Sequence, residues 1–303
     1  MTPNKAPKKQ INGWINLNKP LGITSAQAVN KIKWLLKPTK IGHAGTLDPL
    51  ATGVLPIALG EGTKCVNLLM DARKVYEFDV TFGERRATDD AEGEVVATSN
   101  KTPAGQEIRD LLPRFTGPIS QMPPAYSALK IDGKRAYDLA RAGEEVVLKA
   151  REVTVYSLEL MHFNTERSAS FRACVSKGMY IRSLGRDIAQ AAGSEGYISR
   201  LHRASVGPFT DSNAISLDFL EETIHKTPAF EGNPSFVLPL SVALDDIPAI
   251  SLTAQQEQTL RHGQHVSLVH PDTSLAAALL DGELVALVRV ESGRVLTQRM
   301  LNT

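Results

Sequence analysis

The sequence predicts an α/β fold of the α+β type, followed by a small C-terminal β domain. Strand-like and helix-like patterns are interspersed from about residue 13 to residue 210. After residue 247 the pattern changes to three short strand-like runs, separated by the turn dipeptides Asp281-Gly282 and Ser292-Gly293. Such a meander is typical of a small β-barrel. With 303 residues, 42% of them hydrophobic, the chain suits one large domain and a small one.

Strands are predicted where polar and apolar residues alternate. The predicted strands are residues 13–20, 75–83, 151–163 and 168–176, and residues 54–59 are predicted to be an apolar, buried segment. Helices are predicted where apolar residues recur at helical spacing or where a typical start signal occurs. The first covers residues 23–36 and ends before Pro38. The second covers residues 102–115, with Thr102 as N-cap. The third lies in residues 179–193, where the end of a strand leads into a helix that ends at Gly193.

Charge is unevenly distributed along the chain, although the formal net charge is only +1. Residues 1–48 hold eight lysines and one aspartate, a net charge of +7. Residues 172–203 carry a net +4, whereas residues 211–260 carry a net −7. A polarised distribution can present a basic face to phosphate even when the total is near zero. The same charges are equally compatible with solvated faces that have no partner.

Composition excludes several other classes of protein. The two cysteines, Cys65 and Cys174, are far apart and lack CxxC spacing, which argues against a disulfide framework or a cysteine-based zinc site. No apolar run is long enough for a membrane helix. Residues 1–12 are polar and basic, without the apolar centre of a signal peptide, and predict a short flexible arm. These features together predict a cytoplasmic protein.

The stretch GHAGTLDPLATGVLPI, residues 42–57, is the most informative part of the sequence. Its glycines permit backbone angles closed to other residues and allow close approach of a ligand. Asp48 lies in the middle of this loop, and Pro49 favours an extended conformation before it. A carboxylate held in this way above an apolar segment can act as a nucleophile or base. The alternative is that Asp48 caps a short helix with Pro49 as its first residue, which is the commoner role of an isolated Asp-Pro.

Five motifs in this order resemble the bacterial tRNA pseudouridine-55 synthase family. They are GWINLNKPLGITS (13–25), GHAGTLDPLATGVLPI (42–57), KVYEFDVTFG (74–83), PPAYSALKIDGKRAYDLAR (123–141) and SKGMYIRSLGRDI (176–188). The resemblance extends from about Gly13 to Phe209. The chain departs from the family pattern at Met179, where a threonine is expected. The resemblance therefore leaves the detailed arrangement of side chains near Tyr180 and Arg182 open, but not the reaction.

The resemblance implies a particular organisation of the chain. A flexible basic arm (1–12) is followed by a pseudouridine synthase catalytic domain (13–247) with a mixed, largely antiparallel sheet. A segment of about 124–150 is expected to clamp the RNA. Residues 248–303 are expected to form a PUA-like RNA-binding β-barrel.

The resemblance also implies an activity: isomerisation of uridine 55 in the T loop of transfer RNA, without cofactor or metal. The uridine is flipped out of the RNA, its C–N glycosidic bond breaks, and the base rejoins the ribose through carbon. Asp48 is expected to attack the nucleotide or stabilise a sugar intermediate. Tyr76 is expected to stack on the base and move a proton, and Arg182 to pair with Asp48 and aim it. Without the resemblance, Tyr76 reads as a core aromatic and Arg182 as a surface residue.

Four further residues are implied to contact or support the substrate. His43 would fill the space that the flipped uridine leaves, and Leu201 would pack against the base. Lys19 would brace the catalytic loop, and Tyr180 would bind substrate. Without the resemblance, His43 would be interpreted as an exposed turn residue, Lys19 as a surface residue and Leu201 as a core residue. The expected partner is the T arm of tRNA, with no membrane, guide RNA or obligatory protein partner, and the chain is expected to be a monomer.

Other readings fit the sequence less well. LGEGTK (59–64) is glycine-rich but lacks P-loop spacing. His262, His265 and His270 cluster without a carboxylate or cysteine at metal-binding spacing, and the signature of nucleobase deaminases is absent. A non-catalytic RNA-binding module would explain the basic segments but not Asp48, Tyr76 and Arg182. The guide-RNA-dependent branch of the same superfamily is the other enzymatic alternative.

Overall fold

A computed structural model describes residues 9–124, 126, 130–131, 134–135, 148–164, 167–227, 232–244 and 247–302. Residues 1–8 of the predicted arm and most of the predicted clamp, about 124–150, lie outside the described residues. In the described part of the chain, no helix is long and apolar enough to cross a membrane.

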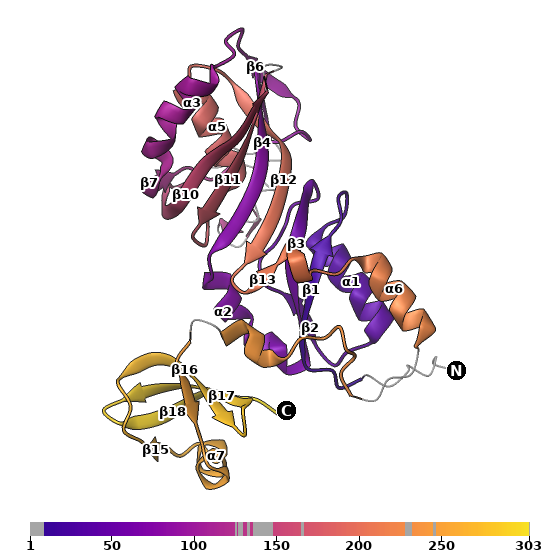
Figure 1. The fold of residues 1–303 in the computed structure, drawn as a ribbon, viewed down its shortest axis with the longest axis vertical. Coiled ribbons are helices and arrows are strands. Elements are labelled where there is room, and N and C mark those ends of the chain that lie inside the picture. Colours follow the sequence, from indigo (N-terminus) through magenta and orange to yellow (C-terminus); the bar gives the residue numbers. More distant parts are fainter. Residues whose placement is uncertain are drawn as a thin grey trace.

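A nine-stranded sheet runs through the body of the molecule (Figure 1). Its order is β1-β3-β12-β4-β11-β10-β7, with β2 on β3 and β13 on β12. Only the β3–β12 pair is parallel among these pairings, so the predicted mixed, largely antiparallel sheet is confirmed. The strands are β1 Gly13–Lys19, β2 Ile41–His43, β3 Ala51–Leu59, β4 Lys74–Phe82, β7 Gly117–Gln121, β10 Arg151–Asn164, β11 Ser168–Val175, β12 Gly196–Val206 and β13 Phe209–Thr210.

Helices cover the two halves of this sheet separately. Helices α1 (Ser25–Leu36) and α6 (Leu217–Lys226) lie together beside β1, while α3 (Gly105–Leu111) and α5 (Ile181–Ala191) lie against the other half (Figure 1). The shorter elements are α2 Val66–Asp71, the 3-10 helices η1 Gly60–Lys64, η2 Leu112–Phe115, η3 Asp211–Asn213 and η4 Leu240–Leu244, and the strand pairs β5 Glu84–Arg86 with β6 Val95–Thr98 and β8 Lys130–Ile131 with β9 Lys134–Arg135.

Local contacts explain where α1 and α3 begin and how closely α5 packs on the sheet. Thr24 caps α1 by accepting a hydrogen bond from the backbone N–H of Gln27. Helix α5 can lie close to the sheet because residue 185 is a glycine; a Cβ atom there would come within 2.5 Å of the Ile198 side chain. The predicted start at Thr102 is wrong: α3 begins at Gly105, because the Glu107 carboxylate accepts the Ala104 N–H and fixes the first turn there.

Two apolar clusters meet where the halves of the sheet join. One lies under α5 and includes Phe78, Phe171 and Ile188; the other lies under α1 and includes Ile32 and Leu55. Tyr76 and Leu201 pack against both clusters and remain only partly buried. The junction between the halves is therefore a place where an apolar floor stays open to solvent.

The C-terminal residues form a separate five-stranded sheet with the order β14-β16-β17-β18-β15, plus α7 (Ala254–Arg261). Its strands are β14 Ala249–Ser251, β15 Val266–Ser267, β16 Thr273–Leu280, β17 Glu283–Glu291 and β18 Arg294–Met300. Asp281-Gly282 and Ser292-Gly293 all have positive φ angles, as tight hairpin turns between twisted strands require. The predicted meander is confirmed.

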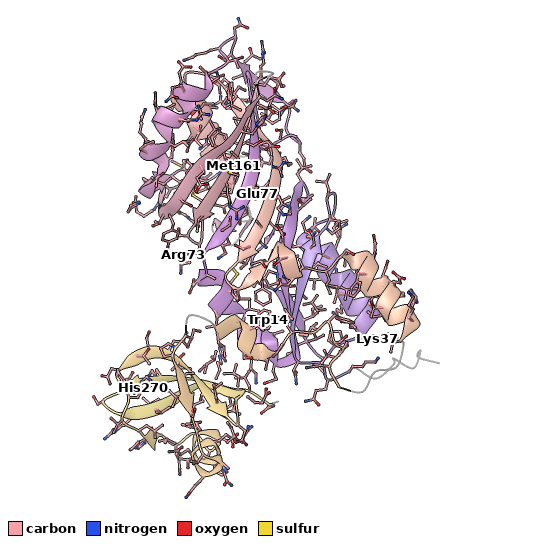
Figure 2. The ribbon with its side chains drawn as sticks, viewed as in Figure 1. Trp14, Lys37, Arg73, Glu77, Met161 and His270 are labelled. Atoms are coloured by element: carbon pink, nitrogen blue, oxygen red, sulfur yellow. The ribbon has the colours of Figure 1, made fainter. Side chains whose placement is uncertain are left out.

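This C-terminal sheet packs firmly on the body of the molecule. Leu284 and Leu287 share an apolar cluster with Trp14, which lies at the base of the central sheet in Figure 2. The Lys64 ammonium group donates to the Met300 carbonyl at 2.8 Å, and the Asn302 N–H donates to Glu61 at 2.7 Å. The C-terminal part therefore has a fixed position relative to the larger part.

Candidate active site

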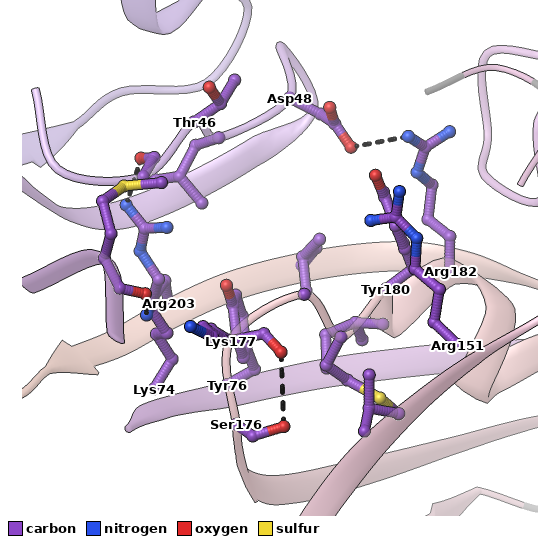
Figure 3. A pocket seen from close by; sticks show the side chains of 18 of the residues that line it. Thr46, Asp48, Lys74, Tyr76, Arg151, Ser176, Lys177, Tyr180, Arg182 and Arg203 are labelled. Carbon is purple, nitrogen blue, oxygen red and sulfur yellow. Dashed lines mark hydrogen bonds and ion pairs between the residues drawn. The ribbon is translucent and has the colours of Figure 1, made fainter. Parts of the chain in front are cut away.

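A cavity of about 600 Å³ opens at the junction of the two halves of the sheet (Figure 3). Its walls come from the loop before β3, from β4 and β12, from the start of β10, and from the turn that leads into α5. Five of the seven predicted site residues line it: Asp48, Tyr76, Tyr180, Arg182 and Leu201. The fold thus brings together side chains that are distant in sequence.

Asp48 lies in the loop between β2 and β3, with its side chain 42% exposed in the cavity. The two residues after it form a turn into β3 rather than a helix, so the alternative that Asp48 is a helix cap is wrong. The loop is held from α1, where the Ser25 hydroxyl donates to the Leu47 carbonyl at 3.0 Å and accepts the Leu47 N–H at 2.8 Å. The carboxylate is therefore exposed on a backbone that is firmly fixed.

Arg182, at the start of α5, is buried and forms the centre of the polar network. Its guanidinium group lies 3.1 Å from the Asp48 carboxylate and 3.4 Å from that of Asp90. It also donates to the backbone carbonyls of Thr88 and Tyr126, each at 2.9 Å. A buried guanidinium with this many acceptors is fixed in orientation, so it can aim Asp48. The surface interpretation of Arg182 is wrong.

Three other predicted site residues, Tyr76, Leu201 and Tyr180, and the neighbouring Met179 also line the cavity. Tyr76 and Leu201 form the apolar floor described above. Gln121 pins Tyr180, because its side chain accepts the Tyr180 N–H at 2.9 Å and donates to the Tyr180 carbonyl at 3.1 Å. Met179 lines the cavity and packs against the cluster under α5, so the departure from the family pattern places a thioether in the wall.

Two predicted residues, Lys19 and His43, are not among those that line the cavity. Lys19 is buried behind the loop, where its ammonium group donates to the carbonyls of Pro20 at 2.9 Å, Ile23 at 2.7 Å and, more weakly, Pro49 at 3.5 Å. His43 is half-buried in β2, and its pKa is lowered chiefly by burial and also by the Arg203 charge, which favours the neutral ring. The expected contact of His43 with RNA stays a prediction.

Burial of Lys19 predicts a pH dependence of activity. Burial lowers the pKa of Lys19 to about 8, so above that pH the folded protein loses the proton, and with it one donor and the charge that bind the loop carbonyls. We expect initial rates on tRNA to fall as pH rises through 8, and we expect Lys19→Arg, which stays protonated, to hold its own rate through this range.

Lys74→Arg is the matched comparison for that experiment. Burial also lowers the pKa of Lys74 to about 8, but its ammonium group donates to carbonyls at the end of α2, not to the catalytic loop. If Lys19→Arg and wild type show the same alkaline fall, Lys19 does not control it. Stability is expected to change in the opposite direction: between the folded and unfolded pKa values the unfolded chain binds more protons, so the contribution of Lys19 makes folding more favourable as pH rises.

Sequence reasoning missed three charged residues around the cavity. Asp90 is the second partner of Arg182. Arg203 is buried under the loop and donates to the Gly45 carbonyl at 3.0 Å and the Val54 carbonyl at 2.8 Å, so it ties both ends of the catalytic stretch. Lys74 is buried nearby. Single charged residues in a turn or an alternating strand carry no pattern that would reveal these contacts.

Among the described residues, no group of three His, Cys, Asp or Glu side chains is placed to hold a metal ion. This includes His262, His265 and His270, the residues weighed above as a metal site.

Comparison with known proteins gives consistent matches to one family. The model of the TruB family pseudouridylate synthase N-terminal domain matches residues 33–181. The tRNA pseudouridine synthase B of Rhodospirillum rubrum is 46% identical over 302 residues, covering 96% of this chain and 97% of the relative. That of Brucella ovis is 44% identical, covering 98% and 97%.

Solved structures share the fold over nearly the whole chain. An H/ACA RNP bound to a substrate RNA containing 2′-deoxyuridine matches with a TM-score of 0.73 and 25% identity, covering 96% of this chain and 85% of that one. A Cbf5-Nop10-Gar1 complex matches with a TM-score of 0.72 and 27% identity, covering 99% and 91%.

Proposed function

Because the chain belongs to the TruB family of pseudouridylate synthases, we propose that it isomerises uridine 55 in the T loop of transfer RNA to pseudouridine. The observation that carries this proposal is the Asp48–Arg182 pair at an open cavity with an apolar floor. A cavity of about 600 Å³ has room for one nucleotide that has left the base stack.

In the proposed reaction the flipped uridine enters the cavity with its base over the floor formed by Tyr76 and Leu201. Asp48 attacks the nucleotide, or stabilises a sugar intermediate, while the bond between N1 and C1′ breaks. The uracil turns, C5 bonds to C1′, and the net change moves one hydrogen from C5 to N1. The product therefore has the same composition as the substrate.

The surrounding residues would position these groups. Arg182, itself held by Asp90, would keep the Asp48 carboxylate aimed at the sugar or base. Lys19 would brace the loop through the Pro49 carbonyl. His43 would take the place of the flipped uridine, and Tyr180 would bind the substrate beside Arg182.

We further propose that the chain acts as a monomer in the cytoplasm, on the T arm, without guide RNA or an obligatory protein partner. Residues 13–247 would form the catalytic domain and residues 248–303 a PUA-like RNA-binding domain. Support comes from the sequence relatives, which are named as tRNA pseudouridine synthases and are 44–46% identical to this chain, whereas the H/ACA RNP and the Cbf5-Nop10-Gar1 complex are 25–27% identical.

The deciding experiment incubates the purified protein with unmodified tRNA alone and maps pseudouridine. Modification at position 55 supports the proposal. Modification that requires an added guide RNA would favour the guide-dependent branch, and binding without modification would favour a non-catalytic RNA module.

RNA binding is expected to depend strongly on salt, despite the net charge of +1. The basic segments 1–48, 130–151 and 172–203 are proposed to face the RNA. Each neutralised phosphate adds roughly 0.7–0.9 to the slope of log affinity against log salt, so several contacts give a slope steeper than about −3. Equilibrium binding between low and moderate salt measures it. A nearly flat titration would show that these segments are not an RNA surface.

A further inference from the structure

Basic side chains surround the cavity, and their partners differ. The lining residues include five that are basic: Lys74, Arg151, Lys177, Arg182 and Arg203. A cation that is already held by protein groups orients the site, whereas a cation without such partners remains available to the substrate.

Four of these cations are held within the protein. Arg182 is held by Asp48 and Asp90, and Lys177 pairs with Asp71 at 2.7 Å across the cavity rim. Lys74 and Arg203 are buried and donate to backbone carbonyls, as described above.

Arg151 differs from them. It is the first residue of β10, its side chain is exposed, and within the described part of the chain no hydrogen bond, ion pair or ring contact involves its guanidinium group. Glu152 also lines the cavity, but no ion pair joins it to Arg151. Figure 3 shows the Arg151 side chain extending from β10 toward the side of the cavity that holds Asp48.

We propose that Arg151 binds a phosphate group that directly adjoins the uridine in the cavity. This inference rests on the proposed function, because it takes the ligand to be RNA. Every nucleotide that leaves the stack carries a phosphate on each side, and these anions must lie near the mouth of the cavity that takes the base. A guanidinium group matches two phosphate oxygens at once, and the free donors of Arg151 are available for that contact.

The contact can be isolated with a double-mutant cycle between protein and RNA. The full-length Asp48→Asn protein, which is expected to bind RNA without turnover, is compared with the Asp48→Asn/Arg151→Gln protein. Each is titrated with T-arm hairpins that carry only phosphates, or one neutral methylphosphonate on the 5′ or the 3′ side of the target uridine. In the presence of Arg151, one of the two methylphosphonates is expected to raise Kd by about 10- to 100-fold.

Arg151→Gln is expected to raise the Kd of the all-phosphate hairpin by a similar factor. In that variant the same methylphosphonate should have little further effect, roughly twofold or less. The slope of log affinity against log salt should also become shallower by about 0.7–1, which a purely structural role would not cause.

Arg114→Gln, in the same Asp48→Asn background, is the matched control. Arg114 is an exposed arginine on η2 that does not line the cavity, so its replacement removes the same charge without changing the cavity wall. It should leave both the affinity and the methylphosphonate effect close to those of its parent.

Additive effects of Arg151→Gln and of both methylphosphonates would overturn the proposal, as would an unchanged Kd. The enzymatic function fails in a different way, when the wild-type protein makes no pseudouridine. The binding cycle uses an inactive background, so it reports on Arg151 whichever way that activity assay turns out.

Discussion

Replacing Asp48 by asparagine is expected to abolish pseudouridine formation while leaving tRNA binding largely intact. Asparagine keeps the size of the side chain but removes the negative charge and the nucleophilic oxygen. The loop keeps its position, because it is held through the Leu47 backbone, Lys19 and Arg203 and not through the Asp48 side chain. We expect turnover to fall by at least about 10⁴-fold, as for the loss of other catalytic nucleophiles.

Single-turnover assays on unmodified tRNA measure the rate, and equilibrium titration measures Kd. Asp71→Asn is a useful control, because Asp71 also lines the cavity and pairs with a basic residue, Lys177, but is two-thirds exposed at the rim. It should retain most of the activity. Turnover by Asp48→Asn within tenfold of wild type would remove Asp48 from the chemistry.

The strands and helices that frame the site could be predicted because local patterns determine them. Alternation predicted β1, β4, β10 and β11 nearly to their ends, and helical spacing together with Pro38 predicted the extent of α1. The start of α3 could not be predicted, because Thr102 and Pro103 are both residues that commonly begin a helix. The helix instead begins after Ala104, whose N–H donates to the Glu107 carboxylate.

The Asp48–Arg182 pair could be predicted only through the family resemblance, since 134 positions separate two residues with no local relation. Nothing in the sequence indicated Asp90, because its contact depends on how the turn after β5 folds back over α5. Arg203 lies beside the loop because β12 pairs in parallel with β3, and strand order is a property of the whole fold. Long-range packing therefore decides the polar network that local patterns cannot reveal.

For Tyr76 the sequence left two roles open, a core aromatic residue and a residue that contacts the base, and the structure favours the second. A core tyrosine normally has a partner for its hydroxyl group. Tyr76 lines the cavity and is only partly buried, and in the described residues no hydrogen bond from its hydroxyl group is found. The ring packs against the apolar clusters on both sides, so the ring is fixed while the hydroxyl group stays available to a substrate.

Tyr76→Phe is therefore expected to separate the two proposed tasks of this residue. The phenylalanine ring keeps the apolar floor, so Kd for tRNA should change little, while loss of the hydroxyl group removes a donor and acceptor at the base. If that group moves a proton, the rate of the chemical step should fall by roughly 10²–10⁴-fold, the range for general acid–base groups. Tyr76→Leu should lose stacking as well and weaken binding further.

Tyr156→Phe is the matched control, because Tyr156 is an exposed tyrosine on β10 that contacts Arg73 outside the cavity. Single-turnover rates and titrations on the same tRNA give both quantities; a Phe variant as fast as wild type would mean that Tyr76 supplies stacking alone and that the proton moves through another group.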